Sequence, residues 1–387
     1  MRKPSLLIVT LIFCCGALPL AGQQPCPSLT VVANSPEDQL LLAVNGADNP
    51  QDQIAALDKY AAAHADSPAM ACVNEYYTAA YVKLNDFDKA IAAGEKDLAA
   101  NYQDVNLLLN LAKAYVGAGK ATDDAFSVIA KAPDQIKTET SSPRPAGISD
   151  DDWQKAQQDA AETARQERAY MEYAFFQLLP RVTDANKRLQ YLDAFAKAYP
   201  DSPNAGQIDV QFMLTYGALN NSAQANEYGD KALAADPNNP AILNAVADNF
   251  ATRQVNLDKA ETAARKALDL VPALKKPDGV SDADFRTAQN TELGAAHLTI
   301  GYIEFQRASK TRKVAGAVQE LKTAVGLLTA NPNLQARALF YLGTAYEFQI
   351  PPDHHAATQA LSEAVKLQSP WQGEAQALLA KIPQHSK

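Results

Sequence analysis

The sequence has few of the residues that build metal centres and nucleic acid interfaces. Four cysteines and five histidines occur among 387 residues, and His64, His297 and His385 are isolated from one another. Acidic residues number 44 against 35 basic ones, which gives a net charge of −9. Binding to phosphates requires concentrated positive charge, and no stripe of lysine and arginine occurs. We therefore expect no nucleic acid partner, no metal and no cofactor.

The sequence also lacks catalytic signatures. Neither Gly-x-Ser-x-Gly nor His-Glu-x-x-His occurs. Residues 117–122 resemble a phosphate-binding loop, but its first glycine and the Ser/Thr after its lysine are missing, so we interpret the segment as a turn. The adjacent His354 and His355 would point about 100° apart on a helix, which favours exposed positions at a helix start over a shared metal site. These absences predict that the protein is not an enzyme.

A third absence concerns β-structure. Alternation of apolar and polar residues with a period of two is not sustained anywhere in the chain, and the sequence therefore predicts an all-α fold. The composition suits a folded protein, because 47% of the residues are apolar and only 20% are charged. The chain has enough apolar material to bury a core along its whole length.

The N-terminus has the layout of a secretory signal peptide. Arg2 and Lys3 precede the apolar residues 5–18, and small residues follow up to Gly22, where we expect cleavage. An uncleaved membrane anchor is the alternative, although the apolar segment is short for one. Lipid attachment at Cys14 is not favoured, because a large phenylalanine stands before it. The protein is therefore predicted to be periplasmic or secreted, with no stable membrane span after cleavage.

Signal cleavage leaves two cysteines, Cys26 and Cys72. In an oxidising compartment they are able to form a disulfide that would pin the N-terminal tail to the start of a helix. Two free thiols are the alternative, and the sequence does not decide between them.

The stretch 192–240 shows how the predicted helices pair. Phe212 and Tyr216 recur at a helical spacing of about four residues. A polar turn follows, and Ala225 and Ala232 mark a second helix whose small residues permit a close antiparallel approach. Helices are predicted in the same manner near the N-terminus, at residues 36–46, 51–64, 68–84, 86–100, 105–117 and 121–132.

These hairpins resemble tetratricopeptide (TPR) repeats, a family with about 34 residues per unit. The resemblance covers residues 36–382 and implies a right-handed α-solenoid, a superhelix of antiparallel helix hairpins. Four units match at some of the preferred positions, including Tyr81, Tyr115, Tyr216 and Phe250. The best-matching unit combines Leu339, Leu342, Gly343, Tyr346, Ala357, Leu361 and Ala364.

In this family the first helices of successive hairpins line a concave groove. The resemblance therefore implies a protein or peptide partner held by side-chain hydrogen bonds and a few apolar contacts. A carboxylate clamp of the chaperone type is not expected, because its lysines and asparagines do not recur in successive units. The groove positions of the family correspond to Asn106, Leu109, Lys113, Gln207, Val210, Leu214, Asn244, Asp248, Arg337, Phe340, Thr344 and Glu347.

A longer internal repeat is superimposed on the hairpins. Residues 57–68 match residues 192–203 at an offset of 135, and residues 147–150 match residues 279–282 at an offset of 132. The second match places a Ser-x-x-Asp cap before each of two long helices. Because loop and capping residues match as well as alanines, we infer an internal duplication with three copies, the last one cut short.

Loops rich in proline, serine and threonine separate the predicted copies. A final amphipathic helix is expected to cover the last apolar face, as repeat arrays require. The predicted organisation is a signal peptide at 1–22, a flexible mature N-terminus at 23–35, a first copy at 36–132, a linker at 133–148, a second copy at 149–272, a linker at 273–280, a third copy at 281–370 and a capping helix at 371–382.

Two functions are compatible with the sequence. The first is a non-enzymatic scaffold of the bacterial cell envelope that binds a peptide or helix in the groove. The alternative is a helical component of an uptake system that binds a glycan or another small ligand. Tyr76, Tyr81 and Tyr115 are candidate stacking residues for it, although the packing positions of TPR repeats already account for Tyr81 and Tyr115.

Overall fold

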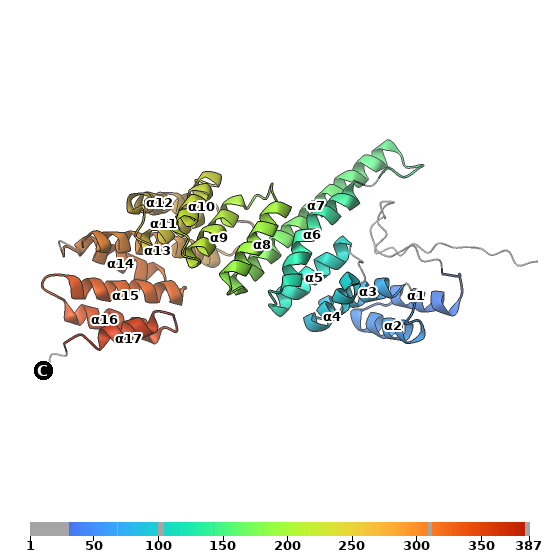
Figure 1. The fold of residues 1–387 in the computed structure, drawn as a ribbon, viewed down its shortest axis with the longest axis horizontal. Coiled ribbons are helices and arrows are strands. Elements are labelled where there is room, and N and C mark those ends of the chain that lie inside the picture. The colour runs from blue at the N-terminus through green and yellow to red at the C-terminus, as the bar shows by residue number, and fades with distance from the viewer. Residues whose placement is uncertain (1–30, 68, 100–103, 142, 309–311, 384–387) are drawn as a thin grey trace, which may run out of the picture. The chain divides into compact units, whose positions relative to one another are not determined.

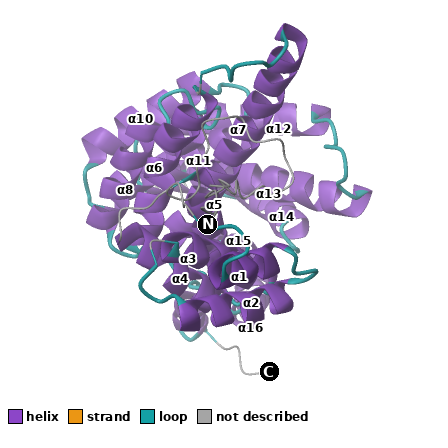
Figure 2. Cartoon of the chain, turned by 90° about the vertical axis from the view of Figure 1, so that its right-hand side faces the viewer, coloured by secondary structure: helices purple, strands orange, loops and turns teal. Residues whose placement is uncertain are grey.

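The computed structural model describes residues 31–67, 69–99, 104–141, 143–308 and 312–383. In these ranges the chain forms seventeen α-helices and two short 3-10 helices, and they contain no strand (Figure 2). The predicted all-α fold is confirmed. Successive helices pack against each other as hairpins, so the chain is an array of helical repeats.

The chain divides into two compact units, Met1–Pro200 and Asp201–Lys387, which we call unit 1 and unit 2. The division lies in neither predicted linker, and the three-copy organisation stays a prediction. Unit 1 (Figure 1, blue to green) contains α1 (Pro36–Asn45), α2 (Pro50–Ala63), α3 (Met70–Lys83), α4 (Phe87–Ala99), α5 (Val105–Ala118), α6 (Asp123–Thr140), α7 (Asp150–Leu178), the 3-10 turn η1 (Leu179–Arg181) and α8 (Ala185–Ala198).

Unit 2 contains four helix hairpins and a terminal helix in its described residues (Figure 1, yellow-green to red). Its elements are α9 (Ala205–Ala218), α10 (Ser222–Ala235), α11 (Pro240–Thr252), α12 (Leu257–Leu270), the 3-10 turn η2 (Val271–Ala273), α13 (Asp282–Arg307), α14 (Ala315–Leu327), α15 (Pro332–Phe348), α16 (His354–Lys366) and α17 (Gln372–Leu379).

Capping side chains fix the starts of many helices. Ser35 accepts a hydrogen bond from the Asp38 amide, and Pro36 occupies the first helical position, where its missing N–H costs nothing. The Asp104 carboxylate accepts a hydrogen bond of 2.7 Å from the Leu107 amide at the start of α5. Helices α1 and α5 therefore begin at the positions that these side chains cap.

The two long helices, α7 and α13, begin with the same local structure. Ser149 accepts a hydrogen bond from the Asp152 amide at 3.2 Å, and Ser281 accepts one from the Asp284 amide at 3.1 Å. The predicted Ser-x-x-Asp caps are therefore present. The same offset of 132 residues relates further features of the two starts, namely the positive φ of Gly147 and Gly279 and the ion pairs Arg144–Asp150 and Lys276–Asp282.

One boundary differs from the prediction. A linker is expected at residues 133–148, but α6 continues through the proline at its start and ends at Thr140. Proline removes one helical hydrogen bond and normally ends a helix. Here Ile136 is buried beyond the proline, and the Glu139 carboxylate accepts a hydrogen bond of 3.1 Å from the Val105 amide. These two contacts hold the additional turns, so the loop before α7 is shorter than predicted.

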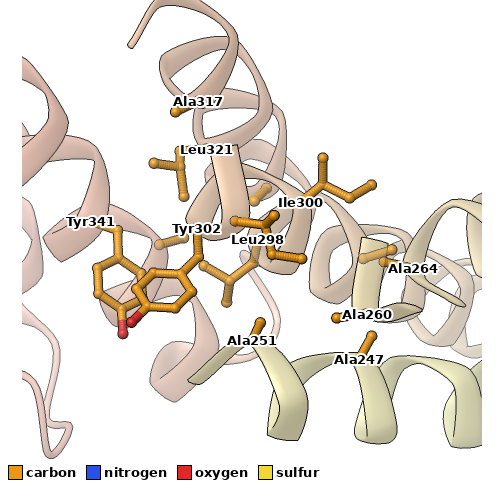
Figure 3. Packing of buried hydrophobic residues seen from close by; sticks show 14 of the residues in the cluster. Ala247, Ala251, Ala260, Ala264, Leu298, Ile300, Tyr302, Ala317, Leu321 and Tyr341 are labelled. Atoms are coloured by element: carbon orange, nitrogen blue, oxygen red, sulfur yellow. The ribbon is translucent and has the colours of Figure 1, made fainter. Parts of the chain in front are cut away.

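Small residues bring neighbouring helices close together. A Cβ atom on Gly94 would lie 2.6 Å from Leu111 Cδ2, and one on Gly343 would lie 2.6 Å from Leu361 Cγ, so only glycine fits at either position. Alanine has the same role in the core of unit 2. In Figure 3 the facing helices α11 and α12 contribute Ala247, Ala251, Ala260 and Ala264, beside Leu298, Ile300 and Tyr302 of α13.

The hairpin of α7 and α8 is built from large side chains instead. Phe175 of α7 stacks on Phe195 of α8 with ring centroids 3.9 Å apart, and Tyr199 stacks on Phe195 at 4.4 Å. The Tyr199 hydroxyl donates a hydrogen bond of 2.8 Å to the backbone carbonyl of Ile129. Stacked aromatic rings therefore fill the space between α7 and α8.

The C-terminal helix covers the end of the array. Trp371, just before α17, lies 5.3 Å from the ring of Phe340 and 5.3 Å from that of Tyr341 on α15. Ala375 and Ile382 are buried against the same cluster. These contacts cover the apolar end of α15, and the capping role of this segment stays a prediction.

Candidate functional site

The predicted binding residues lie on the first helices of the hairpins. We define the first-helix face of unit 1 as the surface of α3, α5 and α7, and that of unit 2 as the surface of α9, α11, α13 and α15. Within each unit these helices pack on one another in that order. The face of unit 2 carries most of the candidates, including Gln207, Asn244, Asp248 and Arg337.

The structure joins two of these candidates directly. Arg337 of α15 reaches Asp248 of α11, 89 residues earlier in the chain. Its Nη1 donates to Asp248 Oδ2 at 3.0 Å, its Nη2 lies 2.8 Å from Asp248 Oδ1, and Nη2 also donates to Thr252 Oγ1 at 3.0 Å. The pairing thus combines one hydrogen bond, to Asp248 Oδ2, with a close ion-pair contact to Asp248 Oδ1. We call it the Arg337–Asp248 tie.

Burial makes the tie a structural contact. Arg337 is only 8% exposed. Burial alone lowers the pKa of its guanidinium, but the charge and hydrogen bonds of Asp248 outweigh that effect and hold the pKa above its ordinary value. Tyr341 and Trp371 lie against the guanidinium, with ring centroids 5.5 Å and 5.8 Å from its central carbon. Arg337 therefore stays charged and makes its polar contacts through its two terminal nitrogens, while its buried Nε has no hydrogen-bond partner among the described residues.

Asn244 is also engaged internally. It is 6% exposed, and its Nδ2 donates to the backbone carbonyl of Glu292 at 3.0 Å and to the Glu292 carboxylate at 2.7 Å. These bonds connect α11 to α13. Asn244 and Arg337 thus hold neighbouring hairpins together, and neither presents a free polar group at the surface.

The candidates on the second half of α15 are half-buried. Thr344 Oγ1 donates a hydrogen bond of 2.8 Å to the carbonyl of Phe340, which is a helix-internal contact. The Glu347 carboxylate lies 2.8 Å from His354 Nδ1. His354, at the start of α16, therefore lies against an acid of α15. The ring of Phe340 packs on Trp371, as described above.

Other candidates on the face of unit 2 are accessible. Gln207 on α9 is exposed, and Leu214, two turns further along the same helix, is 40% exposed. Val210 between them is buried at 7%. A single exposed leucine is ordinary on a folded surface, so Leu214 counts as a candidate only together with the polar Gln207 on the same helix.

The face of unit 1 has a different character. Asn106 on α5 is exposed, and Leu109 and Lys113 are half-buried. The Nζ atom of Lys113 lies 5.7 Å from the ring centroid of Tyr170 on α7. Tyr173, one turn further along α7, packs on Tyr170 at 5.7 Å and is 50% exposed.

Sequence reasoning did not identify Tyr170 and Tyr173 as surface residues of this face. A signal was present, because an offset of 132 residues aligns them with Tyr302 and Phe305 on α13. Thr252 was missed as well, since only the folded arrangement brings it to Arg337.

The tyrosines proposed for ligand stacking do not form one exposed set. Tyr115 is 1% exposed, and its hydroxyl donates a hydrogen bond of 2.7 Å to Glu95. Burial raises the pKa of Tyr115 far above its ordinary value. Tyr81 and Tyr76 are half-buried, and Tyr81 stacks on Tyr77 at 5.9 Å. Tyr115 is therefore a packing residue, as the TPR pattern implies, and is not available to stack on a ligand.

Some predictions fall outside what the structure describes. Cys26 and the side chain of Cys72 lie there, as does the signal segment at residues 1–22. Among the described residues, no cluster of three or more His, Cys, Asp and Glu side chains is placed to hold a metal ion. In the same part of the chain, every helix is too short or too polar to cross a bilayer.

No protein-family model and no curated protein sequence matches the chain. Among solved structures it is similar to a chain of the APC/C hetero-tetramer Cut9–Hcn1, with 15% identity, 90% of this chain and 55% of that chain covered, and a TM-score of 0.43. The chain thus spans about half the length of that match. The C-terminal part of a TPR repeat-containing protein from Cytophaga hutchinsonii matches with 14% identity, 78% and 98% covered, and a TM-score of 0.43. Yeast Tom70 matches with 15% identity, 89% and 87% covered, and a TM-score of 0.30.

Proposed function

We propose that this protein is an exported, non-enzymatic scaffold of the bacterial cell envelope that binds a polypeptide partner on its first-helix faces. One observation carries the proposal. Exposed polar and apolar side chains lie together on these faces, Asn106 and Tyr173 on unit 1 and Gln207 and Leu214 on unit 2. Such mixed surfaces suit an extended peptide or an amphipathic helix, which needs both hydrogen bonds and a few apolar contacts.

The internal contacts of unit 2 favour a scaffold. The Arg337–Asp248 tie and the Asn244–Glu292 hydrogen bonds fix three successive hairpins to one another. A surface held in this way loses little conformational entropy when a partner binds, which favours affinity. We expect such a face to act as a preformed docking surface.

A glycan-binding role has less support. Sugar stacking requires exposed aromatic ring faces, and Tyr115 is enclosed in the core. Among the described aromatic residues of the faces, only Tyr173 on unit 1 is exposed. The uptake component is therefore the second candidate, and it becomes the preferred one only if a sugar competes with polypeptides for these faces.

Export is a separate part of the proposal and rests on the apolar, small-residue pattern of residues 1–22. Fusion of the full chain to alkaline phosphatase, which is active only after export, gives a direct measurement. We expect activity that is lost when residues 1–22 are deleted. Full activity in the deleted form would contradict the signal peptide.

Binding is tested by photo-crosslinking from single positions. A benzoylphenylalanine is placed at Asn106 or Gln207 on the first-helix faces, and at Lys131 or Asp269, which are exposed on second helices, as matched controls. In envelope extract we expect discrete protein adducts from the first pair only. Adducts of equal intensity from all four positions would overturn the proposal. So would the absence of adducts from every position in an extract where a control bait does crosslink.

A further inference from the structure

Two equivalent positions on the first-helix faces carry opposite charges. Lys113 on α5 and Asp248 on α11 are 135 residues apart, which is the offset that relates the packing residues of these helices. Lys113 lies beside Tyr170 of the next first helix. The counterpart of Tyr170 in unit 2, Tyr302, packs on Tyr341, and the ring of Tyr341 lies against the Arg337 that pairs with Asp248. The tyrosines are related by the offset of 132. The two places are thus copies of one arrangement.

In unit 2 the charged position is closed by the chain itself. The Asp248 carboxylate is paired with Arg337, which comes from the first helix two hairpins further on. The rings of Tyr302 and Tyr341 lie 4.6 Å apart beside this pair (Figure 3). In unit 2, Asp248 thus holds a side chain of opposite charge, that of Arg337, against aromatic rings.

In unit 1 the same position has no such complement. Lys113 forms no ion pair within the described residues, and its contact is with the ring of Tyr170. The described residues of unit 1 therefore supply no counterpart of the tie at Lys113. Tyr173 beside it is 50% exposed and extends the open surface.

One acidic group on α7 lies near enough to influence Lys113. Burial raises the pKa of Glu167, while the positive charge of Lys113 acts in the opposite direction. The two do not form an ion pair. The charge of Asp104 also reaches Glu167 and raises its pKa. A carboxylate that approaches Lys113 therefore meets a cation whose neighbouring acid, Glu167, is half-buried.

We propose that Lys113, Tyr170 and Tyr173 bind an acidic side chain of a polypeptide partner. The partner carboxylate pairs with Lys113 Nζ, and its neighbouring apolar residue packs on the exposed ring of Tyr173. This inference rests on the proposed function, because it specifies the chemistry of the partner for the face of unit 1. The group expected at Lys113 is an acid, whereas the group bound at the duplicate position is the basic Arg337. The charges are reversed because Lys113 stands where unit 2 has Asp248.

The test uses matched peptide pairs on an array. Each 15-residue peptide has one Asp or Glu beside a Leu or Trp, and its pair has Asn or Gln in place of the acid. The full-length wild-type protein is compared with Lys113→Gln, with Lys113→Glu, and with Lys131→Gln as an exposed control lysine on α6. We expect the wild type to favour the acidic member of a pair by about fivefold, as a half-exposed ion pair would give.

The variants decide the outcome. Lys113→Gln is expected to lose the preference while still binding, Lys113→Glu to favour the Asn or Gln member of each pair, and Lys131→Gln to match the wild type. Binding without any acid preference, or a preference that survives in Lys113→Gln, would overturn the inference and leave the proposed scaffold intact. Competition by free succinate as strong as that by the peptide would assign the site to a small carboxylate instead. Failure to bind any peptide would count against both proposals.

Discussion

The first-helix faces of the two units use equivalent positions in opposite ways. In unit 2, Asp248 is paired with a buried arginine and the aromatic residues around it are packed. In unit 1, Lys113 lies over one tyrosine, and the next tyrosine, Tyr173, is half exposed. Duplicated repeats keep their packing residues because the hairpin geometry depends on them. Surface charges are free to diverge, and here the divergence separates a closed face from an open one.

The same contrast is visible within the cores. A buried acid, Asp97, occupies a position on α4 where the equivalent residue of unit 2 is Ala232. Asp97 accepts a hydrogen bond of 2.9 Å from Asn74, and the residue equivalent to Asn74 is Asp209. Each unit thus keeps one acid in this pair of positions, but only unit 1 buries it completely. The two units should therefore differ in how their stability depends on charge and pH.

The largest effect is expected from breaking the Arg337–Asp248 tie. Arg337→Met should lower the free energy of unfolding by about 3 kcal/mol. This value is at the low end of the cost of removing one partner from a buried ion pair, because the side chain of Asp248 is 39% exposed and is hydrated in the variant. The equivalent Lys113→Met should change it by less than about 0.5 kcal/mol, since it removes no pair. Urea unfolding measures both.

Arg286→Met, an exposed arginine on α13, is the control for the general effect of losing a cation. The double variant Arg337→Met with Asp248→Asn completes a mutant cycle, and we expect it to be more stable than Arg337→Met alone because no unpaired acid is left. Equal destabilisation by Arg337→Met and Lys113→Met would remove the distinction between the closed and the open face.

The tie also shows where sequence reasoning stops. The repeat pattern places Asp248 and Arg337 on first helices, and the all-α fold and the hairpins follow from residues such as Phe212, Tyr216 and Gly343. The pattern does not say that Arg337 reaches across α13 to α11. That contact depends on the length of one side chain and on the rotation between three successive hairpins, which no local spacing encodes.

The departure at α6 and the role of Tyr115 have related causes. Pro133 is a reliable local signal for a helix end, but burial of Ile136 and a hydrogen bond to the Glu139 side chain outweigh it. Tyr115 fits either a stacking surface or a packing position on its residue type alone. Its hydrogen bond to Glu95 and its burial identify it as packing, as the TPR pattern implies. Tertiary contacts, absent from local patterns, decided both cases.

A smaller effect is expected at the buried acid of unit 1. Burial raises the pKa of Asp97 from 3.8 to about 7, with Asn74 acting in the lowering direction and Asp104 in the raising one. The folded state therefore keeps a proton that the unfolded chain releases near pH 3.8. This contribution to stability is fully present below that pH and is lost as the pH rises through about 7.

Asp97→Asn should consequently stabilise the protein at pH 8 by about 2 kcal/mol. Each pKa unit corresponds to about 1.4 kcal/mol, and an unpartnered amide in place of Asp97 Oδ2 reduces the gain. The variant should show little change at pH 4. Urea unfolding at both pH values measures this, with the exposed Asp134→Asn as the control. A gain of the same size at both pH values would contradict a buried charge as its cause.

The smallest effect concerns the two long helices, where the units are alike. Ser149→Ala and Ser281→Ala each remove one capping hydrogen bond and should cost about 1 kcal/mol. Because the caps have nearly the same lengths, 3.2 Å and 3.1 Å, the two costs should agree closely. Hydrogen exchange in the first turns of α7 and α13 localises each effect, and Ser281→Thr should preserve the cap. Unequal protection in the wild-type helices would show that the duplicated starts have diverged in energy while keeping the same geometry.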